Sequence, residues 1–168
     1  TAGFSTYPIG TFTNAGLFVL CLLMFIGASP GSTGGGIKTS TFFTLLMQTR
    51  SVCTGEAAHV FHRGISKQNI AKASIITILS GAVVCIATFL MCVLEPDCSF
   101  IQLLFEVVSA FGTVGLSTGI TPDLSVAGKL VIIIVMFTGR VGAFTLLSTW
   151  AGRNEKNIRF SEEAVVIG

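Results

Sequence analysis

Apolar residues fall in long blocks along this chain, separated by short polar segments. Three blocks, residues 14–48, 70–94 and 124–150, reach the length of about 20 residues that a helix needs to cross a bilayer. A fourth block, residues 100–111, is too short to cross and is typical of a re-entrant or interfacial helix. The pattern predicts an all-α membrane protein in which a half-helix lies between two full helices.

The first block is interrupted at residues 28–38, which read ASPGSTGGGIK. Pro30 and four glycines prevent these residues from continuing a helix. At membrane depth each unsatisfied backbone polar group costs roughly several kcal/mol, so protein or a water-filled cavity must surround such a segment. We therefore expect a broken transmembrane helix whose loop lines a cavity or a pore.

The composition also indicates a membrane protein. Hydrophobic residues make up 51% of the chain and charged residues 11%, against about a quarter charged in soluble domains. The net charge of +2 comes from loops and ends, so it indicates orientation in a bilayer and not a nucleic-acid partner. The five cysteines lack the CxxC or Cys/His spacing of a metal site and are expected to fill apolar space.

Two stretches of the chain match each other at an offset of 112 residues. TAGFST at residues 1–6 aligns with TVGLST at residues 113–118, and ten of the first 27 positions are identical without gaps. Residues 70–150 are interpreted as one whole unit of helix, pore helix, tight loop and helix, and residues 1–50 as the end of the preceding unit. Residues 51–69 would be a linker and residues 151–168 a tail, and we expect the chain to be a piece of a longer protein.

The loop charges predict the orientation. Basic residues gather between the two units and in the tail, namely Arg50, Arg63, Lys67, Lys72, Arg153, Lys156 and Arg159. The opposite side carries Glu95, Asp97 and Asp123. By the positive-inside rule the linker and the C-terminus are cytoplasmic, and the TAGFST and TVGLST loops face outward.

The polar segment at residues 51–66 allows two interpretations. As a surface helix it would put His59 and His62, three residues apart, on one face, where they could contact a metal or a partner. As a solvated cytoplasmic linker it would need no such site. The linker is the favoured interpretation.

A half-helix followed by a Thr-x-Gly turn is how an ion selectivity filter is built. Glycine adopts backbone conformations closed to other residues, so neighbouring carbonyls can replace the water shell of an ion. Residues 113–115, Thr-Val-Gly, share three letters with the potassium-channel filter TVGYG but contain one glycine only, which suggests fewer ordered sites or weaker selectivity. A simple glycine turn explains one such copy but not two in register.

Four motifs carry a family resemblance. TAGFST, MFIGASPGSTGGGIK, FEVVSAFGTVGLSTG and GRVG resemble the Trk/Ktr/HKT superfamily of potassium transporters, and the closing EEAVVIG is most like the C-terminal part of a bacterial Ktr-type membrane subunit. The resemblance implies K⁺ uptake through four helix, pore-helix, helix repeats around one pore in the bacterial cytoplasmic membrane. It also implies a homodimer above a ring of cytoplasmic nucleotide-binding regulatory subunits, leaves Na⁺ coupling open, and implies no enzymatic activity.

The same resemblance assigns site residues. Filter carbonyls would come from Thr1, Ala2, Gly3, Thr113, Val114 and Gly115. The intramembrane gate would consist of Ala28, Ser29, Pro30, Gly31, Ser32, Thr33, Gly34, Gly35 and Gly36, with Arg140 beside them.

Three charged residues invite roles of their own. A charge in mid-helix costs about 2.5 to 3.5 kcal/mol, so Arg140 should face the pore or a partner, as an electrostatic barrier to cations or as a tether on loop carbonyls. Glu106 could raise the local cation concentration, but a hydrogen bond behind the filter loop is favoured. Lys38 is expected to extend to the cytoplasmic interface.

Two other functions compete with a cation pore. GSTGGGIKT at residues 31–39 nearly matches the phosphate-binding pattern GxxxxGK[ST], but Ile37 displaces the lysine by one position, so a nucleotide hydrolase is disfavoured. An alternating-access carrier would use the broken helix, yet such carriers are commonly built from inverted repeats whereas these run in one direction. A K⁺ pore gated by the glycine-rich loop is the leading hypothesis.

Overall fold

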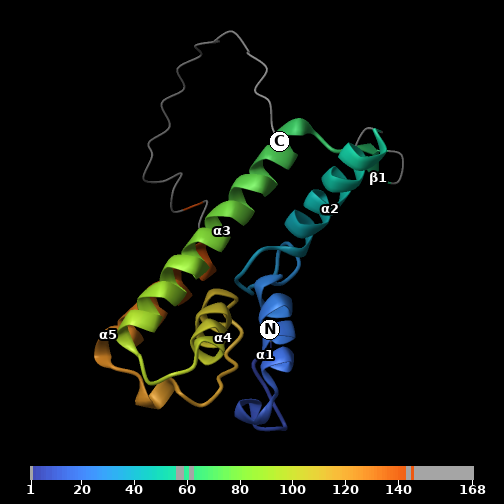
Figure 1. Cartoon of the computed structure of the whole chain (residues 1–168). Helices are drawn as coiled ribbons and strands as arrows, with labels where there is room; N and C mark the ends of the chain where they lie inside the picture. Colours follow the sequence, from blue (N-terminus) through green and yellow to red (C-terminus); the bar gives the residue numbers. More distant parts are fainter. Residues whose placement is uncertain (1, 56–58, 61–62, 143–144, 146–168) are drawn as a thin grey trace, which may run out of the picture.

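The computed structural model describes residues 2–55, 59–60, 63–142 and 145 (Figure 1). Its helices are α1 (Asn14–Phe25), α2 (Thr39–Thr54), α3 (Lys67–Leu94), α4 (Phe100–Phe111) and α5 (Val126–Val141), with short 3-10 turns η1 (Ile9–Thr11) and η2 (Thr121–Asp123). A hairpin of two residues per strand, β1 (His59–Val60) and β2 (Arg63–Gly64), is the only sheet in the described residues. The expected all-α class is confirmed.

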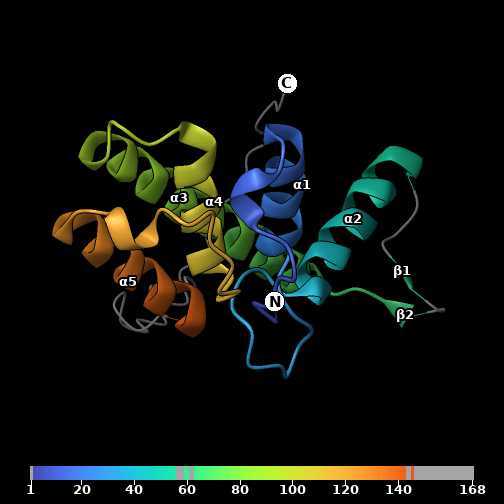
Figure 2. The same ribbon diagram turned by 90° about the horizontal axis from the view of Figure 1, so that it is seen from below.

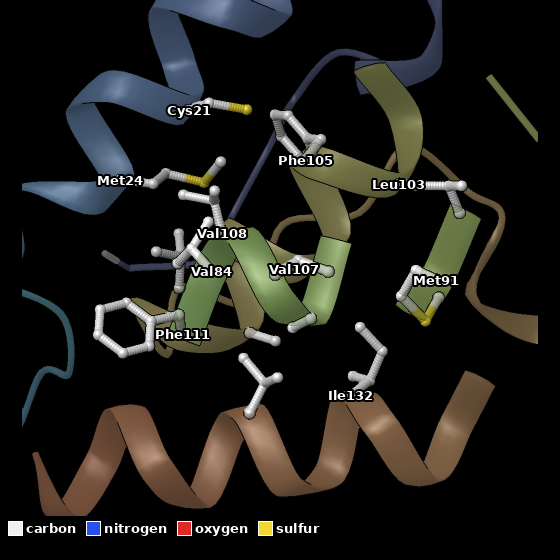
Figure 3. Close-up of a cluster of buried hydrophobic side chains, with 14 of the residues drawn as sticks. Cys21, Met24, Val84, Met91, Leu103, Phe105, Val107, Val108, Phe111 and Ile132 are labelled. Atoms are coloured by element: carbon white, nitrogen blue, oxygen red, sulfur yellow. The ribbon is translucent and has the colours of Figure 1, made fainter. Parts of the chain in front are cut away.

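The short helix α4 lies at the centre of the molecule. It packs against α1 on one side and against α3 and α5 on the other, while α2 packs against α3 (Figures 1 and 2). Side chains of α1 and α5 converge on it from opposite sides (Figure 3). Its buried residues are Leu103, Phe105, Glu106, Val107, Val108, Ser109, Ala110 and Phe111. An apolar helix of 12 residues is thus enclosed by protein.

Helix α3 is long and apolar enough to cross a membrane, and it is the one helix among the described residues that meets both criteria. It begins at Lys67, three residues before the apolar block, because Ser66 caps it by accepting a hydrogen bond from Asn69 N at 3.3 Å. Counting apolar residues misses this polar first turn. The shorter apolar helices are α1 and α4.

The surface helix considered for residues 51–66 is wrong. Helix α2 continues only to Thr54, where Gly55 adopts a φ of 71° and ends it. The chain then forms the hairpin, in which His59 pairs with Gly64. Since His59 lies in a strand, it shares no helical face with His62, which itself lies outside the described residues.

The fifth helix begins two residues after the start of the apolar block at residues 124–150. It starts at Val126, because Ser125 accepts a hydrogen bond from Gly128 N at 3.1 Å and caps it. It runs to Val141. The expected end at Trp150 and the tail at residues 151–168 lie outside the described residues.

The two copies of the repeat have matching backbones. The turns η1 and η2 are 112 residues apart, and so are the first residues of α1 and α5. Equivalent residues cap both helices by the same contact, a hydroxyl that accepts from the amide three residues on, namely Thr13 and Ser125. The two copies differ in where this helix ends, because α1 has 12 residues and α5 has 16.

Candidate functional site

The turn after α4 holds a strained threonine. Thr113 has a φ of 51° and is the only non-glycine residue with positive φ in the described part of the chain. A β-branched residue in this region is an outlier that persists only where its surroundings hold it. Gly115, two residues on, has a φ of 86° at little cost.

The last turn of α4 holds this loop by backbone and side-chain contacts. Thr113 N donates to Ala110 O at 3.1 Å and Val114 N donates to Ser109 O at 2.9 Å. The Ser109 hydroxyl in turn donates to Leu116 O at 2.6 Å. The loop is therefore fixed to the helix that precedes it.

Glu106 organises the rest of the loop from within α4. Its carboxylate is 6% exposed and accepts hydrogen bonds from the Ser117 hydroxyl (2.7 Å), from Thr118 N and its hydroxyl (2.8 and 3.1 Å), and from the Thr121 hydroxyl (2.9 Å). These donors satisfy a buried charge that would otherwise be costly. Of the two roles expected of Glu106, the geometry matches the favoured one, a carboxylate hydrogen-bonded behind the loop.

The two Thr-x-Gly loops meet. Gly3 has a φ of 76°, and a Cβ on it would collide with the Val114 carbonyl oxygen. A Cβ on Gly115 would lie 3.8 Å from Gly3 Cα. The expected filter residues of the two copies are thus adjacent, with Ala2 exposed beside them, while Thr1 lies outside the described residues.

The loop between α1 and α2 is closed at its base. Gly27 N donates to Ile37 O at 2.7 Å, and Ile37 N donates to Phe25 O at 3.2 Å. One residue further, Thr39 N lies 3.4 Å from Ala28 O. The exposed part of the loop consists of Ser29, Pro30, Gly31, Ser32 and Thr33.

The inner side of this loop docks on the end of α4. Gly35 N donates to the Thr113 hydroxyl at 2.7 Å. A Cβ on Gly35 would lie 2.8 Å from Phe111 O and 3.0 Å from Gly139 O. Gly35 is buried, so only glycine lets the loop enter between α4 and α5.

Lys38 has a role that sequence reasoning missed. The expectation that it extends to the interface is wrong, because its ammonium turns back and donates to Gly34 O at 2.5 Å and to Ser32 O at 3.3 Å. The sequence contains a signal for this role, because a lysine beside a glycine run without regular structure can donate hydrogen bonds to the exposed backbone carbonyls. The loop follows helix α1 and not a strand, which speaks against the phosphate-loop interpretation.

Arg140 lies beside both the loop at residues 28–36 and the turn at residues 113–115. It lines a cavity of about 170 Å³ with Gly34 and Lys38, and a second of about 660 Å³ with Thr113 and Gly115. Its side chain is exposed and makes no hydrogen bond or ion pair with another residue that the structure describes. One of the two roles expected of Arg140 was to donate hydrogen bonds to carbonyls of the loop. Among the described residues, Lys38 makes these hydrogen bonds instead.

The end of the molecule where α3 ends and α5 begins is acidic. Glu95 accepts a hydrogen bond from Ser125 N at 2.7 Å and so joins the end of α3 to the start of α5. Burial raises the pKa of the Cys98 thiol, and the carboxylates of Glu95, Asp97 and Asp123 raise it further. Negative charge is therefore concentrated at this end.

Comparison with known proteins gives a consistent picture. A family model described as a cation transport protein, TrkH, matches residues 1–157. The chain is 44% identical over 171 residues to Ktr system potassium uptake protein D of Bacillus subtilis and 39% identical over 170 residues to Ktr system potassium uptake protein B of Vibrio alginolyticus. It is also 39% identical over 175 residues to the potassium/sodium uptake protein NtpJ of Enterococcus hirae.

These matches cover all of this chain but only 37 to 39% of each relative, so the chain spans well under half the length of the relatives. The names are those of transport proteins and not of enzymes, as the resemblance implies. With α3 long enough to cross a bilayer, the match supports a membrane location. On these grounds, the chain belongs to the TrkH family of cation transport proteins.

Proposed function

We propose that this chain contributes two of four filter segments to a pore for K⁺ uptake across a bacterial cytoplasmic membrane. The observation that carries the proposal is the adjacency of Gly3 and Gly115, equivalent residues of two repeats. Both have positive φ, which lets the carbonyls beside them point toward a shared axis. Selectivity then arises from carbonyl geometry with one glycine per segment.

The direction of α4 supports a cation as the substrate. Its C-terminal end at Phe111 leads directly into the loop at residues 113–115. Aligned peptide dipoles give a helix C-terminus a partial negative charge. That charge favours a cation beside the loop without any acidic side chain in the filter.

The loop at residues 28–36 would obstruct the pore below the filter. It docks beneath the end of α4 through Gly35, and Lys38 holds its carbonyls. Arg140 lies within reach of the same space and would act as an electrostatic barrier to cations there.

Deleting Gly31 to Gly36 in the full-length protein should therefore raise cation flux, and a fall in flux with assembly intact would contradict this role.

The missing repeats would come from the rest of a longer chain. A homodimer and a cytoplasmic ring of nucleotide-binding subunits follow from the family resemblance, with the linker and the C-terminus on the cytoplasmic side. Na⁺ coupling is proposed on the same ground, and it is in keeping with the name of the Enterococcus hirae relative. The alternative is an alternating-access carrier, which the interrupted helix between Phe25 and Thr39 favours.

The deciding experiment is ⁸⁶Rb⁺ uptake by vesicles that carry the full-length protein, with and without its cytoplasmic partner. The pore model expects uptake that K⁺ competes for and that shows no counter-transport. With the membrane potential held at zero, uptake accelerated by K⁺ loaded on the far side would favour the carrier. Absence of K⁺-sensitive uptake in vesicles with correctly assembled protein would contradict both.

The filter assignment is tested by Gly115→Ser. The substitution puts a side chain on a residue with φ of 86° and should reduce the preference for K⁺ over Na⁺. Gly119→Ser is the matched control, because Gly119 has a φ of 100° with open space around it and lies outside the Thr-Val-Gly segment. Equal ion ratios in both variants would remove Gly115 from the filter.

A further inference from the structure

A single hydrogen bond joins the intramembrane loop to the filter loop in the described part of the chain. Gly35 N donates to the Thr113 hydroxyl at 2.7 Å across 78 residues of sequence. A Cβ on Gly35 would collide with Phe111 O, so the loop packs closely against the end of α4 beside this bond. The position of the loop is therefore defined against one filter side chain.

Thr113 is also the residue that most needs to be held. Its φ of 51° is strained for a β-branched residue, and its backbone amide is already engaged by Ala110 O. Its hydroxyl makes no other hydrogen bond in the described residues. Branching at Cβ restricts rotation about the Cα–Cβ bond, so a hydroxyl held in place also holds the backbone from which it extends.

We infer that the Thr113 hydroxyl couples the intramembrane loop to the filter, so that displacement of the loop changes which cations the filter accepts. The inference rests on the proposed function and makes Thr113 a positioning residue. While the loop is docked, Gly35 holds Thr113 in its left-handed conformation. When the loop leaves, Thr113 loses that partner and can relax, and the adjacent carbonyls move with it.

Two substitutions in the full-length protein separate the hydroxyl from the shape of the side chain. Thr113→Val keeps the shape and removes the hydroxyl, whereas Thr113→Ser keeps the hydroxyl. The first measurement is amide hydrogen exchange in peptides that cover residues 26–38, which needs no ion flux. Thr113→Val should speed exchange at Gly35 about fivefold, the factor expected for one lost neutral hydrogen bond, and Thr113→Ser should match the parent.

The second measurement is the ratio of ⁸⁶Rb⁺ to ²²Na⁺ uptake in the same variants. Because the docked loop slows cation flow without abolishing it, the ratio includes the docked state, and Thr113→Val should lower it while Thr113→Ser preserves it. Gly35→Ala, which forces a Cβ against Phe111 O, should lower the ratio by itself and leave Thr113→Val without further effect in the double variant. Additive losses would overturn the coupling.

The outcomes distinguish this inference from the proposed function. Unchanged exchange at Gly35 in Thr113→Val overturns the inference whatever the fluxes. Faster exchange with an unchanged ion ratio also overturns it, because the loop would then be attached to Thr113 without affecting selectivity. If the parent protein transports no K⁺ or Rb⁺ while exchange responds as expected, the proposed function fails and the attachment of the loop stands.

Discussion

Met24 and Met136 are identical residues at equivalent positions of α1 and α5, yet Met24 is 5% exposed and Met136 is 46% exposed. The difference extends to the next turn, where Cys21 is 4% exposed and its equivalent Ile133 is 57% exposed. The side of α1 that these residues form packs against α4 (Figure 3). The same side of α5 has no helix against it in the described residues.

The reverse holds for the other side of the two helices. Val135 of α5 is 3% exposed, while its equivalent Leu23 of α1 is 62% exposed. Helix α4 thus lies between the two equivalent helices and touches a different side of each. Such a head-to-tail contact leaves one side of each helix open, and the proposed ring of repeats would cover those sides.

The largest effect on stability is expected at Gly139, whose equivalent Gly27 has different neighbours. A Cβ on Gly139 would collide with Phe111 O of the enclosed helix α4. We expect Gly139→Ala to destabilise the full-length protein by about 3 kcal/mol and to reduce the assembled protein in the membrane, as measured by size-exclusion chromatography in detergent.

Gly27 is the matched comparison for Gly139. A Cβ on Gly27 would collide with Gly35 O, which belongs to the loop and not to the core. Gly27→Ala should leave assembly intact and raise ⁸⁶Rb⁺ uptake. Gly81→Ala in α3 is the control without contacts, because nothing lies within 4 Å of its Cβ position. Equal loss of assembly in the Gly27 and Gly139 variants would contradict the distinction between loop and core.

The next effect concerns the Glu106 carboxylate, which holds the loop that follows α4. Glu106→Ala removes the acceptor for Ser117, Thr118 and Thr121 and should cost about 1 to 3 kcal/mol, because these partly buried donors lose a shared charged partner. Glu106→Gln keeps one acceptor oxygen and should cost less. Thermal unfolding in detergent measures both, and an Ala variant as stable as the parent would remove Glu106 from this role.

The open side of α5 can be tested with tryptophan. If another repeat covers Met136 in the full-length protein, Met136→Trp overfills the contact and should cost about 1 to 2 kcal/mol. Ile134→Trp is the control, because Ile134 is 65% exposed and its equivalent Leu22 is also exposed, at 52%, as expected of a lipid-facing position. Equal stability of the two variants would mean that Met136 also faces lipid.

A smaller effect is expected from the loop clamp. Lys38→Met keeps the apolar stem of the side chain and removes the donors to Gly34 O and Ser32 O. The docked loop should lose about 1 kcal/mol, which corresponds to roughly a fivefold rise in ⁸⁶Rb⁺ uptake if docking limits flux. Lys38→Arg retains hydrogen-bond donors, so its ⁸⁶Rb⁺ uptake should rise less. Uptake below that of the parent would contradict a closed loop.

The smallest effect tests orientation. Cys98 should react with a membrane-impermeant maleimide from the outside, whereas Cys53, exposed in the last turn of α2, should react only from the inside. Because the thiol pKa of Cys98 is raised, its labelling should require a higher pH than that of an unperturbed cysteine. Asp123→Asn removes one of the negative charges and should shift the Cys98 profile back to lower pH.

The sequence predicted what depends on local pattern and on the repeat. The bounds of α4 matched the short apolar block, and the offset of 112 residues paired two stretches whose turns and caps prove equivalent. Glu106 was placed behind the filter loop because a buried carboxylate needs donors nearby. Each inference used neighbours in sequence or a second copy.

What the sequence did not predict depends on contacts between distant segments. The positive φ of Thr113 and its bond to Gly35 follow from how two loops meet at the end of α4. The return of Lys38 to Gly34 O depends on the loop closing on itself. The hairpin at His59 depends on where α2 ends, which is fixed by the left-handed backbone conformation of Gly55 in the folded chain.

The closed base of the intramembrane loop has a consequence for timing. Gly27 and Ile37 are joined by a backbone hydrogen bond of 2.7 Å, so the loop can undock while α1 and α2 keep their positions. Loop motions take nanoseconds to microseconds, whereas collective helix motions take microseconds to milliseconds. Interruptions of current at this barrier should therefore be brief flickers, with slower closures reserved for movements of the helices themselves.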